Sequence, residues 1–326
     1  MNSEALVELA LQSLSCNQKE LAARLGVSPT QISKWKKGEY MSSDMEQKIQ
    51  KLVDIDDMDP EFVLWAGSLN NAKKWEKLIR KLADSAMEDA ETGYNTYPLS
   101  EEEPNLCWKT FLTLRQMGVE IPSEFPAELD IDYELDGYDD DEAIAAAEDL
   151  WAQIEKNPHS ALITRIYGSL NDVYGFYAAY VHYLINDDTL DLYDTDACNI
   201  EPCLMELAGS KIEVDSIFAP RFREFQRQSM KNYESWLSIV KDAAFRAGIP
   251  LKAELLGMVY DSHDELGQDA EAESLGFNST RLHPDIYMNE LLCGMRLIHQ
   301  VLPVIMKKLG IDEDEFELDE SELRIR

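Results

Sequence analysis

The stretch that decides the N-terminal fold runs from Asn17 to Gly38 and reads NQKELAARLGVSPTQISKWKKG. Two short helices that cross closely need a small residue at the crossing and apolar side chains that face each other. Ala22 stands where the small residue is needed, and the apolar positions around the crossing are Leu21, Val27, Ile32 and Trp35. The spacing therefore predicts a helix, a tight turn and a second helix.

The turn between these helices carries residues suited to its backbone. Gly26 favours the left-handed conformation that ends a helix. Ser28 can cap the second helix, and Pro29 suits its first position, where no amide donor is missed. Further on, Ser43 and Glu46 have the spacing of a capping box, which predicts another helix. Its apolar residues would close the domain: Met45, Ile49, Leu52 and Val53.

On these residues, segment 14–53 resembles the helix-turn-helix of the phage repressor/Cro, or XRE, family. The resemblance implies a DNA-binding domain whose first helix of the pair contacts phosphate and whose second helix reads base edges. This chain departs from the family at two positions. Family members often have Glu where this chain has Lys36, and they often have a Pro soon after the residue that matches Gly38, where this chain has a loop without Pro. The DNA-binding residues that the resemblance implies are Gln18, Ser28, Pro29, Thr30, Gln31, Ser33 and Lys34, and the positive charge of the segment adds Lys19 and Lys37.

The distribution of charge also favours double-stranded DNA as a partner of this segment. Residues 1–53 hold seven basic and six acidic side chains, whereas residues 54–326 hold 23 basic and 57 acidic ones. A local surplus of positive charge is what phosphate neutralisation requires. The same apolar residues would also suit a helical pair that contacts only proteins, so this alternative stays open.

The length of 326 residues and the net charge of −33 suit two or three domains with an acidic surface. The pattern predicts an all-α protein, in which an N-terminal helix-turn-helix bundle is followed by a larger acidic helical domain. We expect the helix-turn-helix domain at 1–58 and a helical linker at 59–140, with a basic helix and an acidic irregular segment. An acidic all-α effector or dimerisation domain follows at 141–310, and an acidic tail at 311–326.

Helical periodicity in the larger domain predicts five helices, at 141–156, 160–186, 220–247, 251–266 and 284–309. The helix at 160–186 carries a long apolar and aromatic stripe, which is more typical of a core than of a ligand site. We expect His182 to be hydrogen-bonded in that core. Pro303 should kink the last helix.

Five positive charges, Lys73, Lys74, Lys77, Arg80 and Lys81, lie on one face of a further predicted helix. They could flank the DNA backbone, or they could dock on the acidic body of the same chain. A third alternative is an exposed linker helix with a solvated basic face.

Two acidic patterns could in principle hold a ligand. Residues 132–137 imitate the opening of a calcium loop, but Ala143 stands where that loop needs a glutamate. His263 lies beside Asp264 and Glu265, a combination that can serve acid/base or metal chemistry. Such a triplet arises readily by chance among 63 acidic residues. Since motifs for metal, phosphate or nucleophilic catalysis are also missing from the sequence, we expect no enzyme, metal or other cofactor.

The cysteines indicate a reducing compartment. They are five in number and scattered along the chain. The sequence shows neither a signal-peptide pattern nor an apolar run near 18 residues. We therefore expect a cytoplasmic protein that does not bind membranes. Cys198 and Cys203 lack a second pair of ligands at zinc-finger spacing and are expected to be ordinary thiols.

Together these patterns predict a sequence-specific DNA-binding transcription regulator that acts as a homodimer. Its acidic helical domain would sense a ligand, dimerise or hold a protein partner. The alternative is an antitoxin or defence-system interaction protein, whose acidic body binds a basic protein partner or mimics DNA.

Overall fold

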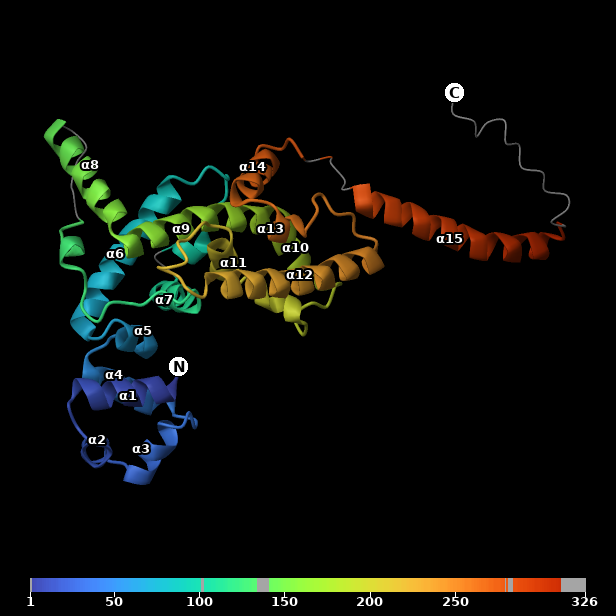
Figure 1. Ribbon diagram of the computed structural model, residues 1–326. Coiled ribbons are helices and arrows are strands. Elements are labelled where there is room, and N and C mark those ends of the chain that lie inside the picture. The colour runs from blue at the N-terminus through green and yellow to red at the C-terminus, as the bar shows by residue number, and fades with distance from the viewer. Residues whose placement is uncertain (1, 101–102, 134–140, 279, 281–283, 312–326) are drawn as a thin grey trace.

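The computed structural model describes residues 2–100, 103–133, 141–278, 280 and 284–311. Most of the calcium-like segment and all but the first residue of the acidic tail lie outside these residues. The described residues form helices and no strands, as the sequence predicted (Figure 1). The α-helices of the first half are α1 (Ser3–Ser13), α2 (Gln18–Leu25), α3 (Pro29–Trp35), α4 (Ser43–Val53), α5 (Pro60–Trp65), α6 (Leu69–Glu88) and α7 (Leu106–Gln116).

The second half of the chain contributes the longer helices. They are α8 (Asp141–Lys156), α9 (Pro158–Phe176), α10 (His182–Ile185), α11 (Leu204–Ser210), α12 (Phe222–Ala247), α13 (Gly257–Tyr260), α14 (His263–Ser274) and α15 (Pro284–Leu309). Short 3-10 turns lie at Tyr97–Leu99, Ala127–Leu129 and Asp196–Asn199.

The first five helices form the N-terminal unit. Helix α1 packs against α4 and α5 and also contacts α2 and α3. Its buried face consists of Leu6, Val7, Leu9 and Ala10, each at most 3% exposed. Because α1 touches every other helix of the unit, its apolar face is the centre of this small core (Figure 1).

An aromatic junction joins the N-terminal unit to the body. The ring of Phe62 in α5 meets Phe111 in α7 edge-on, with centroids 4.8 Å apart, and Phe111 meets Trp75 in α6 at 5.4 Å. Beside these rings, Glu61 accepts hydrogen bonds from Asn2 Nδ2 at 2.7 Å and from Trp108 Nε1 at 2.8 Å. The two parts therefore share one continuous hydrophobic core.

The body is built around α9. Helices α6, α8, α11 and α14 all pack on α9, and α12 packs on α11 (Figure 1). Two buried polar contacts add to this packing. The hydroxyl of Tyr167 lies 2.7 Å from that of Thr110 in α7, and Asn171 donates to the carbonyl of Ala86 at the end of α6.

Helices α6 and α7, which lie in the segment 59–140 that the sequence predicts as a helical linker, pack into this core. Trp75, Leu78 and Ile79 of α6 are fully buried, as are Phe111 and Leu114 of α7. The buried apolar side of α6 thus faces α9.

The long helix predicted at 160–186 is present in two parts. A π-helical turn at Tyr177–Val181 separates α9 from α10. Tyr177 and Tyr180 are buried, as expected of a core stripe, whereas His182 is exposed, so its predicted place in the core is wrong. The His182 ring lies instead beside the Tyr177 hydroxyl, with 3.2 Å between Nδ1 and the oxygen.

Two further predictions of helix boundaries are wrong. The expected helix at 251–266 is divided, because Ser262 and Glu265 form a capping box that starts α14 at His263. The box expected at Ser43 and Glu46 does not form, since Ser42 occupies the cap position and makes no side-chain cap bond. The helices at 220–247 and 284–309 agree with expectation, and α15 continues through Pro303.

Gly175 lets α9 and α14 approach each other. A Cβ atom at this position would lie 2.7 Å from the Cβ of Thr92 and 3.0 Å from that of Ala270. Gly168, in the same helix, faces open space.

We predict that Gly175→Ala lowers the free energy of unfolding by about 1 to 3 kcal/mol, because the new methyl group overpacks a closed site. Gly168→Ala should raise it by about 0.5 to 1 kcal/mol, because alanine is the better helix former. Urea denaturation of the two variants measures both effects. Equal changes in the two variants would contradict the packing of α14 on α9.

Candidate nucleic-acid interface

The α2–α3 pair has the capped, tight-turn geometry that the sequence predicted. Asn17 and Glu20 form a capping box at the start of α2, and Gly26 ends this helix with a φ of 74°. The Ser28 hydroxyl accepts a 3.2 Å hydrogen bond from the Gln31 amide, and Pro29 is the first residue of α3. The predictions for Gly26, Ser28 and Pro29 are confirmed.

The inner face of α3 is fixed to the rest of the unit. Ile32 is fully buried and Trp35 is 5% exposed, while Val27 is only half-buried. Trp35 Nε1 donates to the Tyr40 carbonyl at 3.1 Å, and the Ser3 hydroxyl bonds the Glu39 carbonyl at 2.9 Å. These contacts hold α3 and the loop after it against α1.

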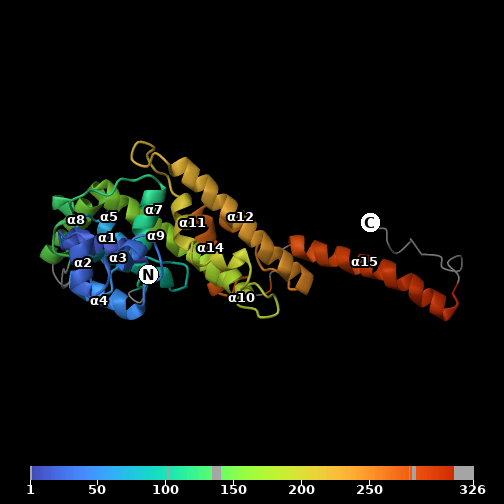
Figure 2. The same cartoon turned by 90° about the horizontal axis from the view of Figure 1, so that it is seen from below.

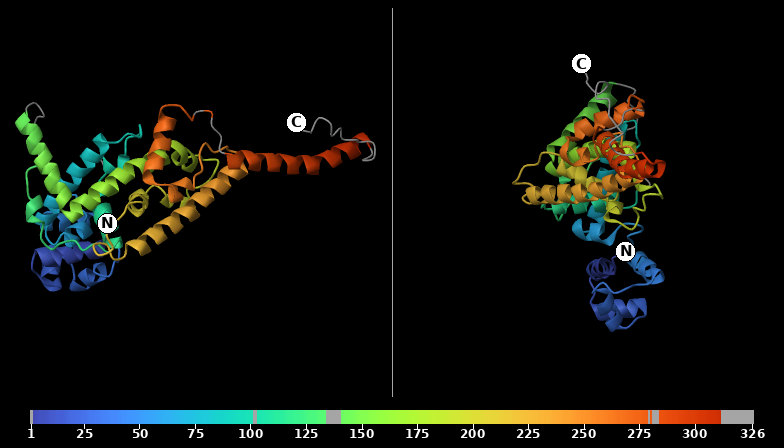
Figure 3. Two further views of the ribbon diagram at one scale, coloured as in Figure 1. Left: turned by 45° about the horizontal axis from the view of Figure 1, so that its top comes forward. Right: turned by 90° about the vertical axis from the view of Figure 1, so that its right-hand side faces the viewer.

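The outer face of the pair is accessible to a large partner. Of the nine predicted DNA-binding residues, six are exposed and three, Gln18, Gln31 and Ser33, are half-buried. The exposed six are Lys19, Ser28, Pro29, Thr30, Lys34 and Lys37. They come from the start of α2, from α3 and from the turn after α3, at the end of the molecule farthest from the body (Figures 1 and 3).

Not all the basic residues of the unit are available to a partner. Lys48 donates to the Leu25 carbonyl at 2.7 Å and so satisfies the C-terminal end of α2. Lys34 forms an ion pair with Glu39, with 3.4 Å between nitrogen and oxygen, and both side chains are about half exposed. Lys19, Lys36 and Lys37 are exposed.

Tyr40 is a residue of this surface that the sequence reasoning missed. It follows the turn after α3, its side chain is 88% exposed, and its carbonyl is bonded to Trp35. A tyrosine hydroxyl is a frequent donor to DNA phosphate. In the sequence, Tyr40 is a single aromatic residue in a polar stretch, and helical periodicity does not predict whether such a residue is buried or exposed.

The basic helix α6 docks in part on its own chain. Lys74 pairs with Asp130, and the Arg80 guanidinium donates to the carbonyls of Ser100 and Glu103, each at 3.1 Å. Of the three alternatives from sequence, these contacts favour docking on the acidic body.

Two other lysines of α6 stay exposed at the junction with the N-terminal unit. Lys73 and Lys77 line a pocket of about 570 Å³. The acidic residues Asp56, Asp57 and Asp59 of the α4–α5 loop line the same pocket.

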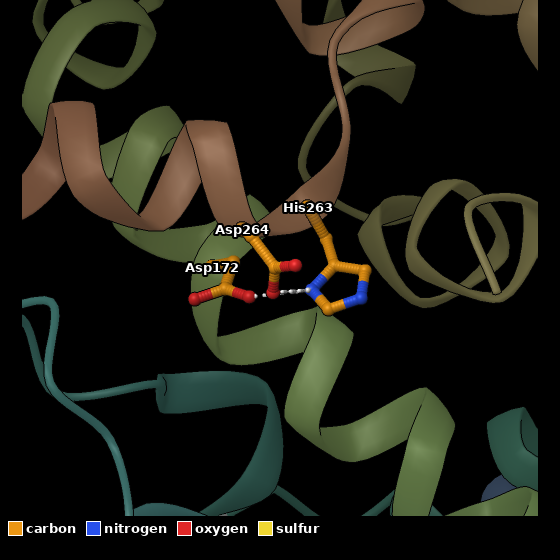
Figure 4. A group of neighbouring side chains, drawn as sticks. All are labelled: Asp172, His263 and Asp264. Atoms are coloured by element: carbon orange, nitrogen blue, oxygen red, sulfur yellow. Dashed lines mark hydrogen bonds and ion pairs between the residues drawn. The ribbon is translucent and has the colours of Figure 1, made fainter.

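The histidine of the acidic triplet forms a different cluster from the one expected. His263 Nδ1 lies 2.7 Å from an Asp172 oxygen and 3.1 Å from an Asp264 oxygen, so the cluster joins α14 to α9 (Figure 4). Glu265 turns away and bonds the amide and hydroxyl of Ser262. Burial raises the pKa of Asp172, and the His263 hydrogen bond opposes that rise.

This cluster has the donors of a metal site, and the three ligand atoms lie within 4.8 Å of one another. It also sits at the first turn of α14, where the helix dipole disfavours a cation. The hydrogen bond between His263 and Asp172, with the Asp264 carboxylate close to the same ring nitrogen, accounts for its geometry. The arrangement therefore fits an interhelical clamp.

We predict that Ser28→Ala lowers the free energy of unfolding of the N-terminal unit by about 1 kcal/mol, because α3 loses its cap. Ser42→Ala is the matched control and should change it by less than about 0.5 kcal/mol, since Ser42 makes no side-chain cap bond. Urea denaturation followed by circular dichroism, without DNA, measures both. Equal losses would contradict the assigned caps.

The comparisons with known proteins agree with this geometry. Residues 7–46 match a family model described as helix-turn-helix. The chain matched no curated protein and no solved structure. Within the described part of the chain, no helix is long and apolar enough to cross a membrane. Segment 7–46 is therefore a helix-turn-helix of the XRE type, a fold that binds DNA.

Proposed function

We propose that this protein is a sequence-specific transcription regulator that reads DNA with α3. The observation that carries the proposal is the contrast between the two faces of that helix. Ile32 and Trp35 fix the inner face, while Thr30 and Lys34 are exposed on the outer face. A rigid helix with an exposed polar face is suited to the major groove.

Different residues of the surface have different roles in this proposal. Gln31 and Lys34 read base edges, because amide and ammonium donors match adenine and guanine. Gln18, Lys19, Lys37 and Tyr40 contact the phosphate backbone and set the orientation of α3. The Ser28 hydroxyl already caps α3, so Ser28 acts chiefly through the position of the helix.

The regulator binds DNA as a homodimer, and its acidic body carries the regulatory role. A single helix-turn-helix contacts few base pairs, and pairing places two half-sites about 10 base pairs apart or at a multiple of that spacing. The chain beyond residue 53, most of which forms the body, has a net charge of −34, so it repels phosphate and limits non-specific binding. Because it binds DNA in this proposal, the protein resides in the compartment that contains the DNA.

We predict that Gln31→Ala and Lys34→Ala each cost about 1 to 3 kcal/mol at the preferred sequence and relax one base position. Lys19→Ala should weaken binding to all sequences about equally, because phosphate carries no sequence information. Selection from a random duplex pool, followed by titration of the enriched sequence, measures both effects.

A pool in which no sequence is enriched would contradict DNA reading. It would favour the alternative of a protein that acts through a partner of its acidic body. Retention of full affinity and specificity by both α3 variants would show that another surface reads the DNA.

Replacement of Glu39 tests the same proposal by an expected gain in DNA affinity. Its ion pair with Lys34 must open before Lys34 can reach a base, and its own charge repels phosphate. Glu39→Gln should therefore raise affinity for specific and random duplexes by about two- to fivefold, the range that an exposed ion pair allows. The gain should shrink at high salt. Unchanged or weaker binding at low salt would place Lys34 away from the DNA.

A further inference from the structure

Helix α15 exposes the largest set of apolar side chains that the structure describes. Of the eighteen large hydrophobic residues exposed there, ten lie between Leu291 and Ile311. Figures 1 and 3 show α15 projecting from the body, and in Figure 2 it begins beside the end of α12 and extends away from the other helices. Exposed apolar surface gathered on one element marks an interaction site.

The comparison with α12 shows that this exposure is particular to α15. Both helices have 26 residues. Tyr233, Leu237 and Val240 of α12 are buried at 1% or less, whereas Ile298 and Leu302 of α15 are 60% and 40% exposed. The apolar face of α12 packs on α11, whereas α15 contacts the body at α12 and leaves Ile298 and Leu302 exposed.

The exposed residues of α15 follow a heptad pattern. Steps of four, three, four, three and four residues connect Leu291, Met295, Ile298, Leu302, Ile305 and Leu309. These six side chains, called the α15 seam below, are between 40% and 68% exposed. Alternating steps of three and four keep one stripe facing another helix along its whole length, as in coiled coils.

The opposite face of α15 is polar. Arg296, Gln300 and Lys307 lie there, and Pro303 falls on the same face, where its missing amide and its ring stay away from the seam. Leu297, Val301 and Val304 are also exposed and lie on one side of the helix, between the seam and Gln300, so they widen the apolar face on that side. The width allows each helix to contact more than one neighbour.

The charge of α15 suits contact with another copy of this acidic chain. Residues 291–309 contain Arg296, Lys307 and Lys308 and no acidic residue, in a chain with 63 acids. Two acidic copies can therefore meet along this stretch without bringing carboxylates of the two stretches together. A seam with heptad spacing is also complementary to itself.

We propose that α15 pairs with α15 of a second copy through the α15 seam. This inference deepens the homodimer of the proposed function by naming its surface. Its test needs no DNA, so a failure here leaves DNA reading by α3 untouched, and a failure of DNA reading leaves the pairing untouched.

The test is the mass of the full-length protein in solution, measured by sedimentation equilibrium over a range of micromolar concentrations. The wild type should show two chains or more, whereas Ile298→Asp combined with Leu302→Asp should show a single chain of 37.2 kDa. Gln300→Asp with Lys307→Gln is the control, because it changes the charge of the same helix equally on the polar face. The control should keep the wild-type mass.

A milder variant separates loss of pairing from loss of structure. Ile298→Ala with Leu302→Ala keeps helix propensity and should raise the dissociation constant by about tenfold or more. Circular dichroism should show the same helix content in the wild type and in all three double variants. It is measured at protein concentrations for which sedimentation has given the mass of each variant.

Three outcomes would overturn the proposal. A wild type that is a single chain at every concentration contradicts pairing. An aspartate variant that keeps the wild-type mass shows that the copies meet elsewhere. A single chain that sediments with anionic lipid vesicles, through the same seam residues, identifies a membrane surface as the occupant of α15.

Discussion

The edge-on packing of Phe62 against Phe111 is the constraint on which the arrangement of this molecule depends. It fixes α5 between the N-terminal unit and the body, and Glu61 strengthens the contact by bridging Asn2 and Trp108. Because α5 packs on α1 at the same time, the position of α1 relative to the body is set as well. The outer face of α2 and α3 is thereby directed away from the body (Figure 3).

This geometry separates two surfaces that differ in charge. Residues 1–53, which include α2 and α3, hold seven basic and six acidic side chains, while the rest of the chain is strongly acidic. Surface charges farther apart than about 8 Å are largely screened at physiological ionic strength, so the body repels DNA mainly when the complex brings the two close together. The cations of α6 do not offset this repulsion fully, because Lys74 and Arg80 are bound to the body itself.

The sequence predicted those features whose causes are local. Gly26 and Ser28 determine their own turn and cap through neighbouring residues, and the stripe of α9 follows from its periodicity. The cap of α4 was misplaced by one residue, since two serines in a row satisfy the same rule. Contacts between distant residues were missed. Nothing near Lys48 shows that it meets the Leu25 carbonyl, and Asp172 lies 91 residues from His263.

The account rests on α3 being the surface that meets the bases, and photo-crosslinking tests this most directly. A photoreactive side chain at Thr30, on the exposed face of α3, is compared with one at Asp57, on the exposed loop between α4 and α5. The account predicts DNA adducts from position 30 that map to one short sequence, and background levels from position 57. Equal adducts from both positions, or adducts from position 57 alone, would contradict it.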